Sequence, residues 1–261
     1  MTTPEPTPLR IGLVTDIHYA DTPANEKRDT RASIGRVRQA VDDFHRHDVD
    51  VVVCLGDLIH SGPDIESECS FMRTVVAELR RVDRPIYFCL GNHCVDRLTK
   101  KEALEIIGQP GATFDATHQG VRLLGLDTCF NPDGSPYGRM NSDWRQAVLP
   151  LTELETLKQT LSKYPVPTIL FTHHRLDGDD DWSLRNAEEI RTGLAANTNL
   201  LAVLQGHAHY ATAQTVSGQT YVTLAPMVSA EASTNAYAVL VIGSRTRPFL
   251  HGFGVQPSQE L

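Results

Sequence analysis

Two histidines separated by one alanine follow an apolar run in the stretch LAVLQGHAHY, residues 201–210. In an extended backbone, side chains two residues apart point to the same side. We therefore expect His207 and His209 to direct two imidazoles at one place. Paired imidazoles beside a glycine have little reason to end a core strand, and imidazole is a common metal ligand. The stretch indicates a metal or catalytic site.

Side chains of the same chemical kind follow four other apolar runs. They occur in the motifs DIH (Asp16, His18), GD (Asp57), GNH (Asn92, His93) and HH (His173, His174). Each motif alone is weak evidence, because short polar motifs of this kind usually mark turns. All five, however, stand where a predicted strand ends. In open α/β sheets the carboxyl ends of strands form the ligand crevice, so these distant groups can converge there.

The first part of the chain alternates short apolar runs with amphipathic stretches. The pattern predicts strands at 10–15, 50–55 and 85–90, and helices at 32–47 and 66–81. This order favours parallel strands joined by right-handed crossovers.

The second part of the chain shows the same kind of pattern. Further strands are predicted at 121–127, 168–172 and 200–205, and a helix at 186–196. Another helix begins at TELE, with Thr152 as N-cap and Glu155 three residues later. Three antiparallel strands are expected at 219–225, 236–243 and 248–253. Since no repeat or linker composition divides the chain, we expect one domain over 9–255, with tails at 1–8 and 256–261.

Composition limits the classes of partner. Lys and Arg total 24 and Asp and Glu total 32, a net charge of −8. This balance argues against broad binding to nucleic-acid polymers or membrane surfaces. No apolar stretch approaches the ~20 residues that span a bilayer, and the start MTTPEPTPLR has no secretory pattern. The five cysteines lack zinc-finger spacing, so reduced thiols and a cytoplasmic location are expected.

The motif set DIH, GD, GNH, H and GHAH resembles the signature of the calcineurin-like metallophosphoesterases. The resemblance extends from Asp16 to His209. It implies an α/β fold, a four-layer α/β/β/α sandwich with two mixed β-sheets and the active site at the strand ends. It also implies two metal ions and the hydrolysis of phosphoesters or phosphoanhydrides.

The resemblance also implies roles for the motif residues. The first metal would be bound by Asp16, His18 and His209, and Asp57 would bridge both metals. The second metal would be completed by Asn92, His173 and His207. His173 is preferred to His174 because it aligns with the strand exit, which leaves His174 beside the ligands or facing the substrate. His93 resembles the family's catalytic histidine.

The donor chemistry agrees with this assignment. Nitrogen and oxygen ligands without thiolate suit Mn²⁺, Fe²⁺/Fe³⁺ or Zn²⁺. A shared carboxylate can hold two such cations about 3.5–4 Å apart, and a water bridging them becomes a hydroxide nucleophile. His93 would stabilise the developing charge or protonate the leaving oxygen.

One residue departs from the family pattern. The family commonly has an acidic residue after GNH, where this chain has Cys94. Either the substitution is tolerated, or His93 loses orientation or the site gains redox sensitivity. No metal ligand is removed in either case.

The substrate is less clearly indicated. The stretches TDIHYAD and NAEEIRTGLAANTNLLAVLQGHAHY look similar to a branch associated with ADP-ribose and CDP-alcohol pyrophosphatases, which overlaps with cyclic-nucleotide phosphodiesterases. Better-known members of that branch have Gln at the position of His18. We expect a small, nucleotide-like phosphorylated substrate, with diester, anhydride and monoester bonds all open. Candidate substrate residues are Tyr19, His174, Arg175 and Arg139. Other loop residues that could clamp a phosphate or stack on a base are Arg28, Arg31, Tyr137 and Trp144. For each of them the alternative is a solvated loop or local packing.

Two other classes of protein have less support in the sequence. A catalytically silent relative that serves as a binding scaffold would usually have lost ligands, whereas all seven positions are filled here. A Ser-His-Asp hydrolase would need a GxSxG elbow, which the chain lacks. The oligomeric state stays open.

Overall fold

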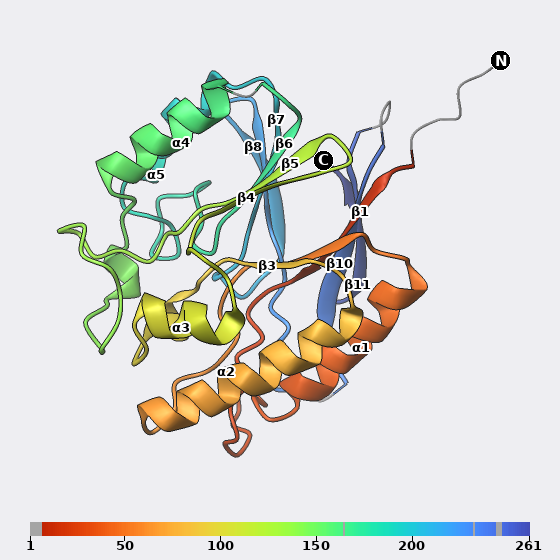
Figure 1. The fold of residues 1–261 in the computed structure, drawn as a ribbon, viewed down its shortest axis with the longest axis vertical. Helices are drawn as coiled ribbons and strands as arrows, with labels where there is room; N and C mark the ends of the chain where they lie inside the picture. Colours follow the sequence, from red (N-terminus) through yellow and green to blue (C-terminus); the bar gives the residue numbers. More distant parts are fainter. Residues whose placement is uncertain (1–6, 164, 232, 244–246) are drawn as a thin grey trace.

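Two stacked β-sheets form the centre of the molecule, and helices cover their outer faces (Figure 1). The computed structural model describes residues 7–163, 165–231, 233–243 and 247–261. Helices α1 (Ser33–Arg46), α2 (Ile65–Leu79) and α3 (Lys100–Ile107) lie beside the first sheet, and α4 (Leu151–Lys163) and α5 (Ala187–Ala195) beside the second. The layers are those of the expected α/β/β/α sandwich with two mixed sheets.

The first sheet has the order β12-β11-β10-β1-β2-β3. Its three parallel strands are β1 (Leu9–Val14), β2 (Val51–Cys54) and β3 (Ile86–Phe88), connected through α1 and α2. The predicted βαβαβ order is confirmed. The antiparallel strands are β10 (Ala236–Ile242), β11 (Phe249–Gly254) and β12 (Gln259–Glu260). The last of these lies in the segment that the sequence set apart as a C-terminal tail, and it pairs with β11.

The second sheet has the order β4-β5-β6-β7-β9-β8. Its strands are β4 (Phe114–His118), β5 (Val121–Gly125), β6 (Thr168–Phe171), β7 (Leu200–Gln205), β8 (Thr212–Val216) and β9 (Gln219–Thr223). The strands β5, β6, β7 and β9 run parallel to their neighbours in that series. The carboxyl ends of parallel strands in both sheets carry the polar motifs.

Two details of the predicted pattern are wrong. The strands expected at 219–225 and 236–243 do not pair with each other, because β9 belongs to the second sheet and β10 to the first. Thr152 is not an N-cap, because α4 already includes Leu151 and the Pro150 carbonyl accepts from the amides of Glu153 and Leu154. The elements α3, β4 and β8 were not anticipated.

Alternation along the strands divides the core into two parts. Leu9, Ile11 and Leu13 of β1 point into the space between the sheets, where they meet apolar side chains of the second sheet. Val14 belongs to the layer between the first sheet and its helices, together with Phe44 of α1. Apolar burial on both faces holds the strands rigidly, which fixes the loops at their carboxyl ends.

Candidate metal centre

Loops from the two sheets are bonded to one another where the strands end. The amide of Asp16 donates to the Gly56 carbonyl at 3.1 Å, and that of His18 donates to the Asp57 carbonyl at 2.9 Å. Across the sheets, the amide of His207 donates to Asp16 Oδ2 at 3.0 Å. These bonds bring motifs far apart in the sequence to one edge of the sandwich.

The first group of donors consists of Asp16, His18 and His209. Asp16 Oδ1 lies 3.6 Å from His18 Nε2 and 3.3 Å from His209 Nε2. The two imidazole nitrogens are 3.0 Å apart. Thr15 Oγ1 donates to Asp16 Oδ2 at 2.6 Å, so the second carboxylate oxygen is already bonded and Oδ1 faces the histidines.

The second group consists of Asp57, His173 and His207, with Asn92 beside it. His173 Nε2 lies 3.5 Å from Asp57 Oδ2 and 3.2 Å from Asn92 Oδ1. His173 Nδ1 is 2.9 Å from the Leu55 carbonyl, to which it donates as N–H. That bond points Nε2 at Asp57 and Asn92. Burial by itself would lower the pKa of His173, but the Asp57 carboxylate raises it to about 9, so a metal bound at Nε2 would displace a proton from the ring.

One carboxylate oxygen, Asp57 Oδ2, lies between the two groups of donors. Asp57 Oδ2 lies 3.4 Å from His18 Nε2 and 3.5 Å from His173 Nε2. The other oxygen, Oδ1, accepts from the backbone amide of His93 at 2.9 Å. Asp57 is therefore held between the groups in the position that a bridging carboxylate would need.

The residues present fit a pair of divalent cations. Asp16 Oδ1 and His207 Nε2 are buried and have no hydrogen-bond partner in the part of the chain that the structure describes. Burying a polar atom without a partner costs about 1–3 kcal/mol, and a cation would remove that cost. The donors are carboxylate, amide and imidazole, which suit Mn²⁺, iron or Zn²⁺.

Most of the donor residues have a strained backbone. Their φ angles are positive although none is glycine: Asp16 (49°), His18 (46°), Asp57 (49°), His207 (70°) and His209 (58°). Such conformations cost about 1–3 kcal/mol each and persist where the surrounding structure imposes them. The strand β7 ends at Gln205, so the strand alternation expected for His207 and His209 does not apply. Left-handed turns, not an extended strand, orient their rings.

Two glycines allow the close approach of the donors. A Cβ on Gly91 would lie 2.2 Å from Asp57 Oδ1, and one on Gly206 would lie 2.8 Å from Asp16 Oδ2. Neither position has room for a side chain while the carboxylate stays in place.

Electrostatics keep the carboxylates ionised. Burial by itself would raise the pKa of Asp57, but the neighbouring charges of His173 and His93 hold it well below its usual range. The pKa of Asp16 is likewise well below its ordinary value, because the nearby imidazoles of His18 and His209 outweigh the effect of burial. Burial lowers the pKa of His18 to about 3, so its ring is neutral. Ionised carboxylates and neutral imidazoles are the forms that bind metals.

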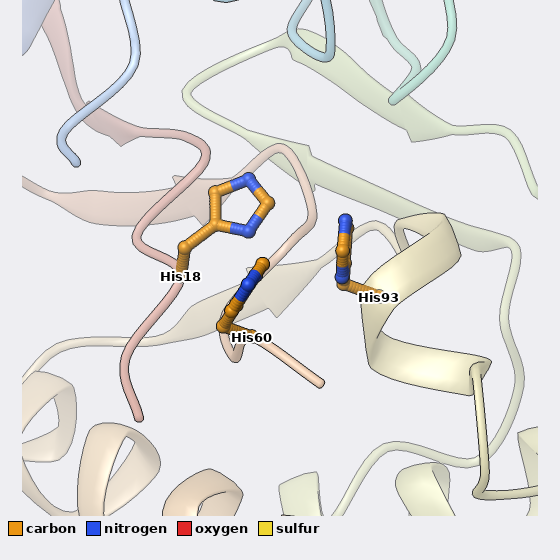
Figure 2. A group of neighbouring side chains, drawn as sticks. All are labelled: His18, His60 and His93. Carbon is orange, nitrogen blue, oxygen red and sulfur yellow. The ribbon is translucent and has the colours of Figure 1, made fainter. Parts of the chain in front are cut away.

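His93 lies at the edge of the donors and beside His18 (Figure 2). Its ring centroid is 4.7 Å from that of His18, and His93 Nδ1 is 3.3 Å from Ser61 Oγ. Ser61 Oγ donates to Asp96 Oδ2 at 2.7 Å. The chain Asp96–Ser61–His93 gives the ring a fixed orientation although the residue after His93 is a cysteine.

His60, three residues after Asp57 in the chain, also lies beside the site. It stacks on His93 at 5.0 Å between ring centroids, and the two rings face His18 (Figure 2). Arg28 lies above it, with a guanidinium nitrogen 3.2 Å from His60 Nδ1 and another 3.5 Å from His209 Nδ1. The only signal in the sequence was the spacing of three residues from Asp57.

The candidate substrate residues occupy different surroundings. His174 is buried, with Nδ1 2.9 Å from Thr128 Oγ1 and its ring centroid 4.5 Å from that of His207. The ring of Tyr19 meets that of Phe71 edge-on, and both side chains are partly buried against the core.

Both candidate arginines are paired with acidic groups. Arg175 donates to Asp177 at 2.9 Å and to Asp180 at 2.7 Å. Arg139 donates to Glu102 at 2.6 Å and to the Arg97 carbonyl at 2.8 Å. Among the described contacts, only those of His174 join the metal-ligand group directly.

Comparison with known proteins decides the family. The family model for calcineurin-like phosphoesterases matches residues 9–211, which include every motif described above. The chain belongs to the calcineurin-like phosphoesterase family. It is thus a hydrolase of the binuclear metallophosphoesterase class.

Several relatives resemble this calcineurin-like phosphoesterase. It is 26% identical over 212 residues to the 3′,5′-cyclic adenosine monophosphate phosphodiesterase CpdA of Haemophilus influenzae, an alignment covering 77% of this chain and 70% of that protein. It is also 26% identical over 112 residues to a manganese-dependent ADP-ribose/CDP-alcohol diphosphatase of Arabidopsis thaliana, covering 41% of this chain and 36% of the plant protein.

A solved structure shows the same fold. A dimetal phosphatase from Danio rerio superposes with a TM-score of 0.81 at 20% identity, covering 97% of this chain and 98% of the other. In the described part of this phosphoesterase, no helix is both long enough and apolar enough to cross a membrane.

Proposed function

We propose that the protein hydrolyses a phosphodiester, diphosphate or phosphomonoester bond of a small nucleotide-like substrate, using two divalent cations. The observation that carries the proposal is the position of Asp57 Oδ2, 3.4 Å from His18 Nε2 and 3.5 Å from His173 Nε2. A carboxylate oxygen between two sets of nitrogen donors is what a binuclear centre requires.

Each donor has a proposed place in this centre. One cation would be held by Asp16, His18 and His209, and the other by Asn92, His173 and His207, with Asp57 shared. Two cations bound there would supply an acidified water as nucleophile and would neutralise charge on the phosphoryl oxygens. Manganese is supported by the manganese-dependent plant relative, and iron or zinc fits the same donors.

The protein's own residues have separate tasks in the proposed reaction. The Ser61–Asp96 pair orients His93 through Nδ1, so Nε2 is the nitrogen proposed to give a proton to the leaving oxygen. The backbone amide of His93 holds Asp57 in place. Orientation of His93 therefore does not depend on an acidic side chain at position 94.

Two features favour a small soluble substrate. The named relatives act on cyclic AMP and on ADP-ribose or CDP-alcohols, and the net charge of −8 opposes binding to polyanions. All five cysteines are free thiols, which agrees with the proposed cytoplasmic location.

A metal add-back experiment tests the proposal. Chelated, metal-depleted protein is assayed with p-nitrophenyl phosphate and with bis-p-nitrophenyl phosphate, before and after addition of Mn²⁺ or Zn²⁺. Hydrolysis of either ester that disappears on depletion and returns with metal supports the proposal. Tight binding of two metals without hydrolysis of either ester, or of ADP-ribose and cyclic AMP, would favour the silent scaffold instead.

A further inference from the structure

Both tryptophans of the chain contact the ring of His207, one of the candidate metal ligands. The sequence contains only Trp144 and Trp182, and their ring centroids are 5.1 Å and 5.3 Å from that of His207. Each ring meets His207 edge-on, at interplanar angles of 79° and 71°. The two indoles stack on each other at 4.8 Å and 22°. We call this pair the tryptophan wall.

The tryptophan wall lies beside the buried ring of His207 and is itself partly exposed to solvent. His207 is 3% exposed, whereas both tryptophans are partly exposed. Trp182 is also nearly parallel to His209, with an interplanar angle of 21° and a centroid distance of 6.4 Å. That separation is wider than the 4.8 Å between Trp144 and Trp182, so Trp182 and His209 are nearly parallel but not in a close stack.

The loops that carry the wall are fastened together. The amide of Arg185 donates to the Ala147 carbonyl at 2.9 Å. The side chain of Asn186 accepts from the Leu149 amide at 3.0 Å and donates to the Leu149 carbonyl at 2.8 Å. The two rings are therefore positioned before any ligand arrives, which lowers the entropy cost of binding.

We propose that the tryptophan wall is a binding surface for a planar ring of the substrate, such as a nucleobase, while the phosphoryl group lies at the metal centre. This inference rests on the proposed function. The metal centre would bind only the phosphoryl group, and the tryptophan wall would bind a second part of the substrate, its planar ring. Stacking on an aromatic face tolerates any base, because every base has a π-face. The tryptophan wall would therefore favour ligands that carry a planar ring but would distinguish only weakly between different bases.

A structural role for the indoles would predict otherwise. If the two rings only shielded His207 from water, ligands with and without a ring would bind equally, and substituting Trp182 would weaken both alike. A ring-binding role predicts loss for ring-bearing ligands alone.

Intrinsic fluorescence tests the wall directly. Because both tryptophans belong to it, emission excited at 295 nm reports on the wall and on no other tryptophan. Zn²⁺-loaded protein is titrated with AMP and, in parallel, with ribose 5-phosphate, which carries the same phosphate without the base. We expect a saturable change in emission with AMP and none with ribose 5-phosphate. Equal responses to both ligands, or no response to either, would overturn the inference.

A second arm uses competition and a conservative control. AMP and ribose 5-phosphate are compared as inhibitors of p-nitrophenyl ester hydrolysis by the wild type, Trp182→Leu and Trp182→Phe. Stacking should favour AMP over ribose 5-phosphate by about 5- to 150-fold in the wild type. The preference should be much smaller in Trp182→Leu and should be recovered in Trp182→Phe, which keeps an aromatic ring. An unchanged AMP preference in Trp182→Leu would contradict the inference and leave the proposed hydrolysis standing. Absence of hydrolysis of both p-nitrophenyl esters, ADP-ribose and cyclic AMP would instead refute the proposed function, while the fluorescence titration would still decide whether the tryptophan wall binds a ring.

Discussion

His18 Nε2 and His209 Nε2 lie 3.0 Å apart, although 191 residues separate them in the chain. Both nitrogens also lie within 3.6 Å of Asp16 Oδ1. These three atoms have too few hydrogens among them for each lone pair to accept a hydrogen bond. A cation bound between them would be coordinated by all three lone pairs. Asp57 Oδ2 lies between this group and the second group of donors, so both groups should respond to the same changes in metal.

Asp57→Asn should lower both metal content and turnover. The amide keeps the volume of the side chain but removes the charge that two cations would share. We expect kcat/KM to fall by more than the roughly 10- to 100-fold typical of residues that only orient a ligand. Metal per protomer is measured by elemental analysis of the purified variant. Asp42→Asn, an exposed change on α1, is the matched control and should leave both values unchanged. Full metal content in Asp57→Asn would contradict the bridging role.

Removal of metal should destabilise the protein as well as inactivate it. Ions that bind only the folded state stabilise it by mass action, and the buried donors would lose their partners. With metal at about 100 times its dissociation constant, the midpoint of thermal unfolding should lie roughly 5–10 °C above that of the chelated protein. Differential scanning calorimetry measures the difference. Identical midpoints with and without Mn²⁺ or Zn²⁺ would argue against a resident metal.

Gly91→Ala should damage the centre without changing any ligand. Its Cβ would lie 2.2 Å from Asp57 Oδ1, so the carboxylate or the backbone must move. We expect weaker metal binding and a loss of about 1–3 kcal/mol in the free energy of unfolding, the usual cost of overpacking. Gly35 lies in α1, and a Cβ added there would have no other atom within 4 Å. Gly35→Ala should therefore raise the free energy of unfolding by about 0.5–1 kcal/mol. Denaturant unfolding of both variants checks the contrast, which fails if they behave alike.

Cys94 should be unreactive in the folded protein. It is buried, the Leu58 amide donates to its sulfur at 3.4 Å, and burial raises the pKa of its thiol to about 12. The other cysteines except Cys69 are also buried. Titration with a thiol reagent should therefore find one reactive group in the native protein and five after denaturation. Rapid labelling of Cys94 in native protein, located by mass spectrometry, would restore the redox interpretation.

The sequence by itself determined the family, the alternation of strands and helices and the identity of the metal-type side chains. Each of these follows from local information: apolar periodicity predicts the parallel strands β1, β2 and β3, and the motifs follow directly from residue types. Short elements with mixed polarity, such as β4 and β8, were missed for the same reason. Their burial patterns do not show a long apolar run.

Only the tertiary structure decided how these residues meet. The assignment of β9 and β10 to different sheets depends on pairing between distant segments, which a local pattern does not contain. The orientation of His207 and His209 comes from their left-handed backbone conformations, and the His207 amide is held by a hydrogen bond to Asp16, so strand alternation does not set it. The contacts among Trp144, Trp182 and His207 likewise join three segments that are far apart in the chain. Contacts of this kind are set by long-range packing, so they become visible only when the chain is folded.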